Sequence, residues 1–144
     1  CAILGLTFLQ IFLGALVAGL KAGLTYNTWP LMDGKLVPNG LTTQTPLWRN
    51  VFENVTTVQF NHRLGAYILL ALVFWHAVRV LRTADDERVS RSALLLAGLV
   101  ALQVGLGIWT LLAVVPLSLA LTHQALAILV LAAAVWHAHA LVKG

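Results

Sequence analysis

One stretch of this chain occurs twice, and each copy carries two histidines inside a long apolar run. The first copy spans residues 60–77 and the second spans residues 121–138, so the copies are offset by 61 positions. An imidazole in such a run is costly unless something pairs with it or binds to it. The repeat therefore predicts two similar helices whose histidines face each other across a bundle. The matching pairs are His62 and His123, Ala66 and Ala127, Leu70 and Leu131, Ala71 and Ala132, Trp75 and Trp136, and His76 and His137.

The composition indicates that most of this chain is solvated by lipid. Hydrophobic residues make up 60% of it and charged residues only 10%, whereas a soluble domain has about 25% charged residues. We therefore predict an integral membrane protein in contact with a lipid bilayer. The formal net charge is +4, but the arginines gather at the ends of apolar runs, which is typical of membrane topology. The basic balance is thus no sign of nucleic-acid binding.

Four apolar segments have about the 20 residues that are needed to cross a bilayer core. We place them at about residues 1–20, 58–80, 92–114 and 117–141. Pro116 and Ser118 interrupt the last two, which predicts a tight helical hairpin there. The predicted fold class is all-α, an integral membrane four-helix bundle. It forms a single transmembrane domain over residues 1–144, with one long outer loop at about residues 21–57.

The basic residues predict which side of the membrane each connection faces. The connection at residues 81–91 is rich in arginine, and the carboxy end carries Lys143. Because Lys and Arg favour the cytoplasmic side, we expect both termini and the 81–91 loop to be cytoplasmic in a bacterial inner membrane. The 21–57 loop is then periplasmic. Its own basic residues weaken this asymmetry without reversing it, and they are Lys21, Lys35 and Arg49.

A second similarity extends the repeat to the other two spans. Gln10 precedes Gly14 by four residues in the first span, and Gln103 precedes Gly107 in the same way in the third. Each of these spans is followed by a histidine span, so a two-helix unit occurs twice, with a pseudo-twofold relation between the copies. Repeats of this kind commonly build a site at their interface.

The histidines of each copy lie on one face of their helix. They are fourteen residues apart, which corresponds to nearly the same face and to about 21 Å along the helix axis. The second and fourth spans run in the same direction. We therefore expect His62 to face His123 near the outer surface and His76 to face His137 near the inner one.

The outer pair, His62 and His123, is the stronger candidate for a cofactor site. Two imidazoles on parallel membrane helices suit the axial ligands of one haem iron. Arg63 lies next to the first of them, where a guanidinium can pair with a haem propionate. Small neighbouring residues leave room for a flat macrocycle, although they also serve close packing of helices in lipid. The alternative is that both histidines hydrogen-bond to the backbone or to glutamine in a tight bundle.

The inner pair, His76 and His137, is the weaker candidate. Its spacing matches a second stacked haem, as in a cytochrome b, but a Trp-His pair near the inner surface can also anchor in headgroups. A stand-alone b-type cytochrome with one or two bis-histidine haems, used for transmembrane electron transfer, is therefore an alternative function. A structural or assembly subunit without haem is another. Zinc or copper is not favoured, because neither pair has Cys, Asp or Glu nearby at membrane depth.

Several motifs in order resemble the haem A synthases of the proteobacterial and mitochondrial type. The resemblance covers nearly the whole chain, and a set of motifs in the right order is far more specific than any single one. The motifs are GALVAGLKAGLTYNTWPLM at 14–32, RNVFEN at 49–54, VQFNHR at 58–63, QVGLG at 103–107 and THQ at 122–124.

This resemblance implies that the chain is the second half of an eight-helix oxidoreductase. Haem A synthases oxidise the C8 methyl of haem O to the formyl group of haem A. By the resemblance, His62 and His123 hold a haem b in this half, whereas the substrate haem O binds in the amino-terminal half. The proposed catalytic glutamate of the family belongs to that other half. We therefore assign no catalytic residue here and expect Glu53 to be a loop or cap residue.

The resemblance also implies a chemical role and partners. Two imidazoles saturate the iron, so a haem held in this way suits electron transfer rather than oxygen activation. We expect this half to be inactive alone unless it self-associates, and a homodimer would recreate an eight-helix assembly. Haem O synthase and the assembly proteins of cytochrome oxidase biogenesis are the other partners that the resemblance implies.

Overall fold

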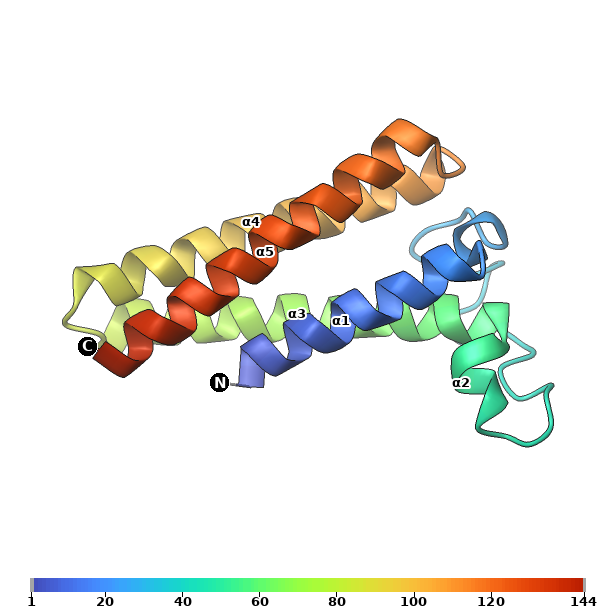
Figure 1. Ribbon diagram of the computed structural model, residues 1–144, viewed down its shortest axis with the longest axis horizontal. Helices are drawn as coiled ribbons and strands as arrows, with labels where there is room; N and C mark the ends of the chain where they lie inside the picture. The colour runs from blue at the N-terminus through green and yellow to red at the C-terminus, as the bar shows by residue number, and fades with distance from the viewer. Residues whose placement is uncertain (1, 144) are drawn as a thin grey trace.

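The computed structural model describes residues 2–143, which form a bundle of long helices (Figure 1). Across residues 2–143 there is no strand, apart from an isolated bridge between Met32 and Lys35. The predicted all-α class is therefore confirmed. Cys1 and Gly144, the ends of the predicted domain, lie outside the described residues. The elements in order are α1 (Ala2–Gly19), the 3₁₀ turn η1 (Ala22–Leu24), α2 (Arg49–Glu53), α3 (Val55–Thr83), α4 (Glu87–Leu112) and α5 (Leu117–Lys143).

Within residues 2–143, four helices are long and apolar enough to cross a membrane, namely α1, α3, α4 and α5. They match the predicted spans, and the largest difference is that α4 begins at Glu87 rather than near residue 92. The Asp86 carboxylate accepts a hydrogen bond from the Arg88 backbone N–H at 2.7 Å and so caps this end. Glu87 also pairs with Arg91 one turn later. The charged first turn thus extends the helix beyond the apolar segment.

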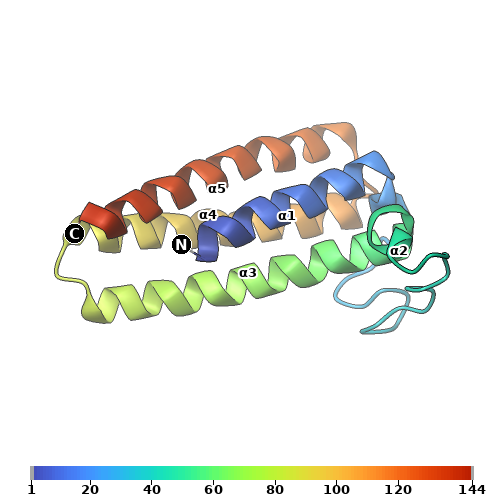
Figure 2. The ribbon, with the colours of Figure 1, turned by 60° about the horizontal axis from the view of Figure 1, so that its bottom comes forward.

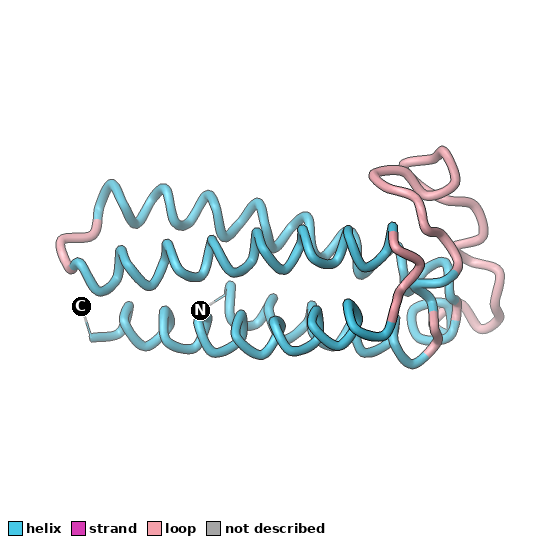
Figure 3. Tube along the Cα trace, turned by 90° about the horizontal axis from the view of Figure 1, so that it is seen from above, coloured by secondary structure: helices cyan, strands magenta, loops and turns pink. Residues whose placement is uncertain are grey.

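The helices pair as the repeat predicts. α1 packs against α3, and α4 packs against α5. Figure 1 shows the α4–α5 unit above the α1–α3 unit, and Figure 2 shows α1 between α3 and α5. Figure 3 shows that short connections join α3 to α4 and α4 to α5, whereas the long 25–48 segment gathers at one end of the bundle. α4 runs antiparallel to α3, and α5 runs antiparallel to α4. α3 and α5 therefore run in the same direction.

The buried apolar core occupies one half of the bundle. Its residues lie at 69–80 on α3, at 89–100 on α4 and at 130–134 on α5, which are the halves nearer the α3–α4 connection. In Figure 1 the two units diverge from that end towards the end with the 25–48 segment. The units therefore pack against each other mainly around the inner histidines. The outer histidines lie beyond this core.

The long connection is folded by buried asparagines. The Asn54 side chain caps α3 by accepting hydrogen bonds from the backbone of Thr56 and Thr57, and its Nδ2 donates to the carbonyl oxygen of Gly40 at 2.8 Å. Asn50, only 3% exposed, donates to the carbonyl oxygen of Leu47 at 2.9 Å. The 40–50 part of this connection is thus fastened to the outer end of α3.

The predicted hairpin between the last two spans is confirmed, because only residues 113–116 separate α4 from α5. Val114 and Val115 adopt left-handed backbone conformations here, with φ of 61° and 54°, which β-branched residues rarely do. Asn27 from the long connection donates to the Leu111 carbonyl oxygen at 3.0 Å. This bond ties the first unit to the hairpin of the second.

Candidate functional site

Each outer histidine contacts the glutamine of its own two-helix unit. Nε2 of Gln10 donates to the carbonyl oxygen of His62 at 2.9 Å and lies 3.1 Å from its Nδ1. Nε2 of Gln103 donates to the carbonyl oxygen of His123 at 3.0 Å and lies 3.4 Å from its Nε2. The repeat thus extends to side-chain contacts. These are the bonds of the hydrogen-bonded alternative. A histidine that ligates iron would instead donate its second ring N–H to an acceptor, such as the oxygen of the same amide.

Two glycines lie directly against the outer imidazoles. A Cβ atom added to Gly107 would come within 2.8 Å of Cε1 of His123, and one added to Gly14 would come within 3.2 Å of Cε1 of His62. A Cβ atom added to Gly105, two residues before Gly107, would meet nothing within 4 Å. The spacing of glutamine and glycine in each unit therefore places an amide and a bare backbone along the same imidazole ring.

The inner pair fixes the relative depth of α3 and α5. Nε2 of His76 and Nε2 of His137 hydrogen-bond to each other at 2.8 Å. Both helices are continuous from this contact back to the outer histidines. Since the helices run in parallel, His62 and His123 lie at matching depths, about 21 Å farther towards the outer end.

The inner pair belongs to a network that joins three helices. The Ser92 hydroxyl of α4 donates to the carbonyl oxygen of Val89 at 2.9 Å and lies 2.8 Å from Nδ1 of His137. The serine oxygen can therefore accept the Nδ1 hydrogen, which leaves Nε2 of His137 to accept from Nε2 of His76. His137 is 2% exposed and Ser92 is fully buried. Sequence reasoning missed Ser92, because a lone serine near a helix end carries no pattern.

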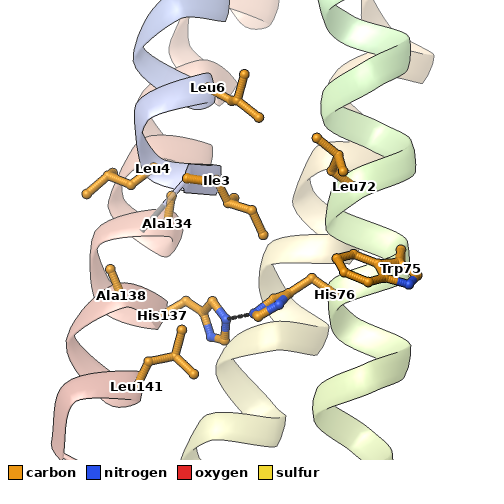
Figure 4. Close-up of a pocket in the computed structure, with 11 residues that line it drawn as sticks. Ile3, Leu4, Leu6, Leu72, Trp75, His76, Ala134, His137, Ala138 and Leu141 are labelled. Carbon is orange, nitrogen blue, oxygen red and sulfur yellow. Dashed lines mark hydrogen bonds between the residues drawn. The ribbon is translucent and has the colours of Figure 1, made fainter.

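Figure 4 shows the two inner imidazoles pointing towards each other beside an apolar pocket of about 280 Å³. Leu6 of α1, Leu72 of α3 and Ala134 of α5 are among its lining residues. The two Nε2 atoms are 2.8 Å apart, so the inner imidazoles are each other's hydrogen-bond partners in this structure.

Arg63 fastens the outer connection beside His62. Its Nη1 donates to the carbonyl oxygen of Thr28 at 2.8 Å, and its Nη2 donates to that of Tyr26 at 2.7 Å. Gln59, one turn earlier on α3, also donates to the Tyr26 carbonyl oxygen, at 3.1 Å. The guanidinium predicted to pair with a propionate thus holds backbone carbonyls, while its Nε has no partner among residues 2–143.

The remaining charged and titratable candidates lie away from the outer pair. Glu53 is in α2 and forms an exposed ion pair with Arg49, whose pKa this contact raises. It is a residue of the outer connection, as expected. His139 is exposed on α5. In the part of the chain that the structure describes, no group of three or more His, Cys, Asp or Glu side chains could hold a metal ion.

The fold and these contacts define the class of protein: an integral membrane protein made of two similar helix pairs, each of which holds a histidine against a glutamine and a glycine. The chain belongs to the COX15-CtaA family of cytochrome oxidase assembly proteins, whose family model matches residues 1–135.

Relatives named heme A synthase are similar to this chain. The proteins of Chelativorans sp. (strain BNC1), Brucella ovis and Rhizobium meliloti (strain 1021) are 58%, 57% and 53% identical to it, over 128, 128 and 136 residues. These matches cover 89%, 89% and 94% of this chain but only 36%, 36% and 37% of the relatives. The chain therefore spans little more than a third of their length. No solved structure matches it.

Proposed function

We propose that this chain is the haem-binding half of a haem A synthase and that it holds one haem b between His62 and His123. The complete oxidoreductase would convert the C8 methyl of haem O to the formyl group of haem A, with the substrate bound elsewhere in the protein. The observation that carries this proposal is the symmetric support of two imidazoles at matching depth on parallel helices. Family membership supports the reaction.

The residues around the outer pair suit a bis-histidine haem. When bound, such a haem supplies one-electron transfer, because two imidazoles leave no open coordination position on the iron. Gln10 and Gln103 bond the backbone carbonyls of His62 and His123 and also contact their rings. The packed core ends before this level. Each ring is therefore held by contacts within its own two-helix unit and not by packing between the units.

Arg63 and the outer connection act at the mouth of this site. The arginine holds the carbonyl oxygens of Tyr26 and Thr28, so the 25–31 segment lies across the first histidine helix. This cover would exclude water from one side of the outer pair. From the arginine-rich 81–91 connection, we place the cover on the periplasmic side of a bacterial inner membrane.

The stand-alone cytochrome is not favoured as an alternative. The relatives are heme A synthases, and the inner pair, which a two-haem cytochrome would use, is hydrogen-bonded together at 2.8 Å. We therefore propose a single haem at the outer level.

Methionine variants of the outer histidines test the proposal. Methionine can still ligate iron, so His62→Met and His123→Met should alter the reduced-minus-oxidised haem spectrum of the purified protein while circular dichroism stays helical. His139→Met, a change at an exposed histidine of α5, is the matched control and should leave the spectrum unchanged. A wild-type spectrum in both outer variants would rule out this pair as the ligands.

A further inference from the structure

We propose that Gln10 and Gln103 are positioning residues for the two haem ligands, and that each amide sets the plane and the basicity of one imidazole. This inference rests on the proposed function, since it concerns the histidines that would hold the haem. It assigns a role to the glutamine and glycine pattern of the first and third spans, which the ligand assignment itself leaves unused.

Each amide is anchored to the residue that it would position. Nε2 of Gln10 donates to the backbone carbonyl oxygen of His62 at 2.9 Å, and Nε2 of Gln103 does the same for His123 at 3.0 Å. A helix carbonyl cannot move with the side chain. The amide is therefore fixed beside the imidazole of the same residue, rather than joining the helices at an unrelated place.

Polar atoms without partners point to a second bond at this position. Oε1 of Gln10, Oε1 of Gln103 and Nδ1 of His123 are buried and have no hydrogen-bond partner within residues 2–143. Buried polar groups are normally satisfied. An amide oxygen accepts and a protonated ring nitrogen donates, so the atoms left over in the second unit are a complementary pair.

The chemistry of iron ligation requires that pair. A neutral imidazole that binds a metal through one nitrogen carries its hydrogen on the other, and this hydrogen almost always goes to a carbonyl or carboxylate oxygen. His62 already turns Nδ1 towards Gln10, but the amide atom at 3.1 Å is Nε2, and Oε1 lies beside Gly65. The amide must therefore shift to present its oxygen to the ring. His123 turns Nε2 towards Gln103 instead, at 3.4 Å. With His123 turned like His62, and with each amide shifted so that Nε2 keeps the backbone carbonyl while Oε1 faces the ring, both Nδ1 atoms have an acceptor and both Nε2 atoms are free to ligate.

Glutamine suits this task better than its isosteres. Its NH₂ group bonds the backbone carbonyl while its oxygen remains for the ring, so one side chain serves both groups. Leucine supplies neither bond, and glutamate supplies only the oxygen. The glycine one turn along the same helix, Gly14 or Gly107, lets the ring lie against the backbone at the required level.

Two leucine variants and two glutamate variants test this role by spectroscopy and potentiometry on the purified, haem-loaded chain. In Gln10→Leu and Gln103→Leu the ring loses its acceptor. We expect the midpoint potential to rise and the low-field electron paramagnetic resonance signal of the ferric haem to shift. Loss of such a partner should lower haem affinity about 10- to 100-fold. Gln10→Glu and Gln103→Glu retain an oxygen, so their potential should lie at or below the wild-type value.

Gln44→Leu is the matched control. Gln44 is a partly buried glutamine of the outer connection, and its Oε1 also has no partner in the described chain. Its amide bonds the carbonyl oxygen of Glu53 instead of a histidine. We expect this variant to lose stability as the others do, with the potential and the resonance signal of wild type.

The outcomes separate this inference from the proposed function. Wild-type potential and resonance in both leucine variants, or shifts equal to that of Gln44→Leu, would overturn the positioning role. Should the leucine variants not accumulate, a potential above wild type in the glutamate variants would overturn it. Failure of the His62→Met and His123→Met test would instead remove the proposed function itself. A positive result there with unchanged glutamine variants would reject the positioning role alone.

Discussion

The outer and inner histidine pairs lie on the same two helices and at the same spacing, yet their bonds differ. The inner imidazoles bond to each other, and His137 also contacts Ser92. The outer imidazoles each contact a glutamine within their own unit. The buried core surrounds the inner pair and ends before the outer one. The repeated histidines therefore link the two units at the inner level, whereas at the outer level each imidazole is supported by its own unit.

The comparison teaches that histidine spacing alone does not identify ligands in a membrane bundle. A ring nitrogen that already bonds another ring is engaged in holding helices together, and such polar contacts between helices are a common form of glue in lipid. A ring supported from behind by an amide is free at its other nitrogen. The partner of each imidazole is thus more informative than its position in the sequence.

The largest effect that would sharpen this comparison is on haem content. His62→Ala and His123→Ala remove a ligand, so we expect haem affinity to fall by more than the roughly 10- to 100-fold that loss of a ligand's hydrogen-bond partner costs. His76→Ala and His137→Ala remove neither a ligand nor a partner of one, so their haem content should stay close to that of wild type. Pyridine haemochrome assay per milligram of protein measures both. Equal losses in the two sets would break the distinction between the pairs.

A second effect concerns the glycines at the outer level. Gly107→Ala would place a methyl group 2.8 Å from the His123 ring, and Gly14→Ala would place one 3.2 Å from His62. Overpacking commonly costs about 1–3 kcal/mol, so we expect severalfold weaker haem binding, with the larger loss at Gly107. Gly105→Ala is the control, because nothing lies within 4 Å there. Haem titration measures the three, and equal affinities would show that the rings do not need this space.

A third effect concerns stability at the inner pair. His137→Ala leaves Ser92 and His76 without their partner in an apolar surrounding, which should lower the free energy of unfolding by about 1–3 kcal/mol. Ser92→Ala removes one bond between helices and should cost about 0.6 kcal/mol. Unfolding in detergent mixtures measures both variants. If His137→Ala were as stable as wild type, the network would not hold the helices together.

The smallest effect concerns the outer cover. Arg63→Gln removes two bonds to the carbonyls of Tyr26 and Thr28, and a net loss of about 1 kcal/mol corresponds to a roughly fivefold larger open population. Proteolysis of the 25–48 segment should speed up by about this factor. Arg49→Gln disrupts only an exposed ion pair and should leave the rate nearly unchanged. Identical rates for both variants would show that Arg63 does not fasten the cover.

Much of the fold could be predicted because lipid imposes simple rules on the sequence. Apolar length located α1, α3, α4 and α5, and Pro116 located the hairpin. The start of α4 was placed too late, because Asp86 and the charged first turn form helix outside the apolar segment. The fold of the 25–48 segment could not be predicted, since it depends on asparagine bonds to distant carbonyls.

The candidate site could be predicted only in part. The duplication predicted the inner contact between His76 and His137 and made His62 and His123 the candidates, because helical period and parallel direction determine depth and face. A bond between glutamine and the outer histidines was predicted only as the alternative to ligation and without naming the partners, since its formation depends on how α1 and α4 are rotated. The hydrogen bonds from Arg63 to backbone carbonyls were missed. Every residue has a backbone carbonyl, so the sequence does not indicate which one an arginine will bond.

The ratio of haem b to polypeptide in the purified wild-type protein tests the central claim most directly. Haem extraction with quantitative amino-acid analysis measures this ratio, and the accompanying spectrum reports spin state. We predict one low-spin haem b per chain, held at the outer level. Two haems per chain would contradict the division of roles between the pairs, and a chain without haem after reconstitution would contradict the proposed site altogether.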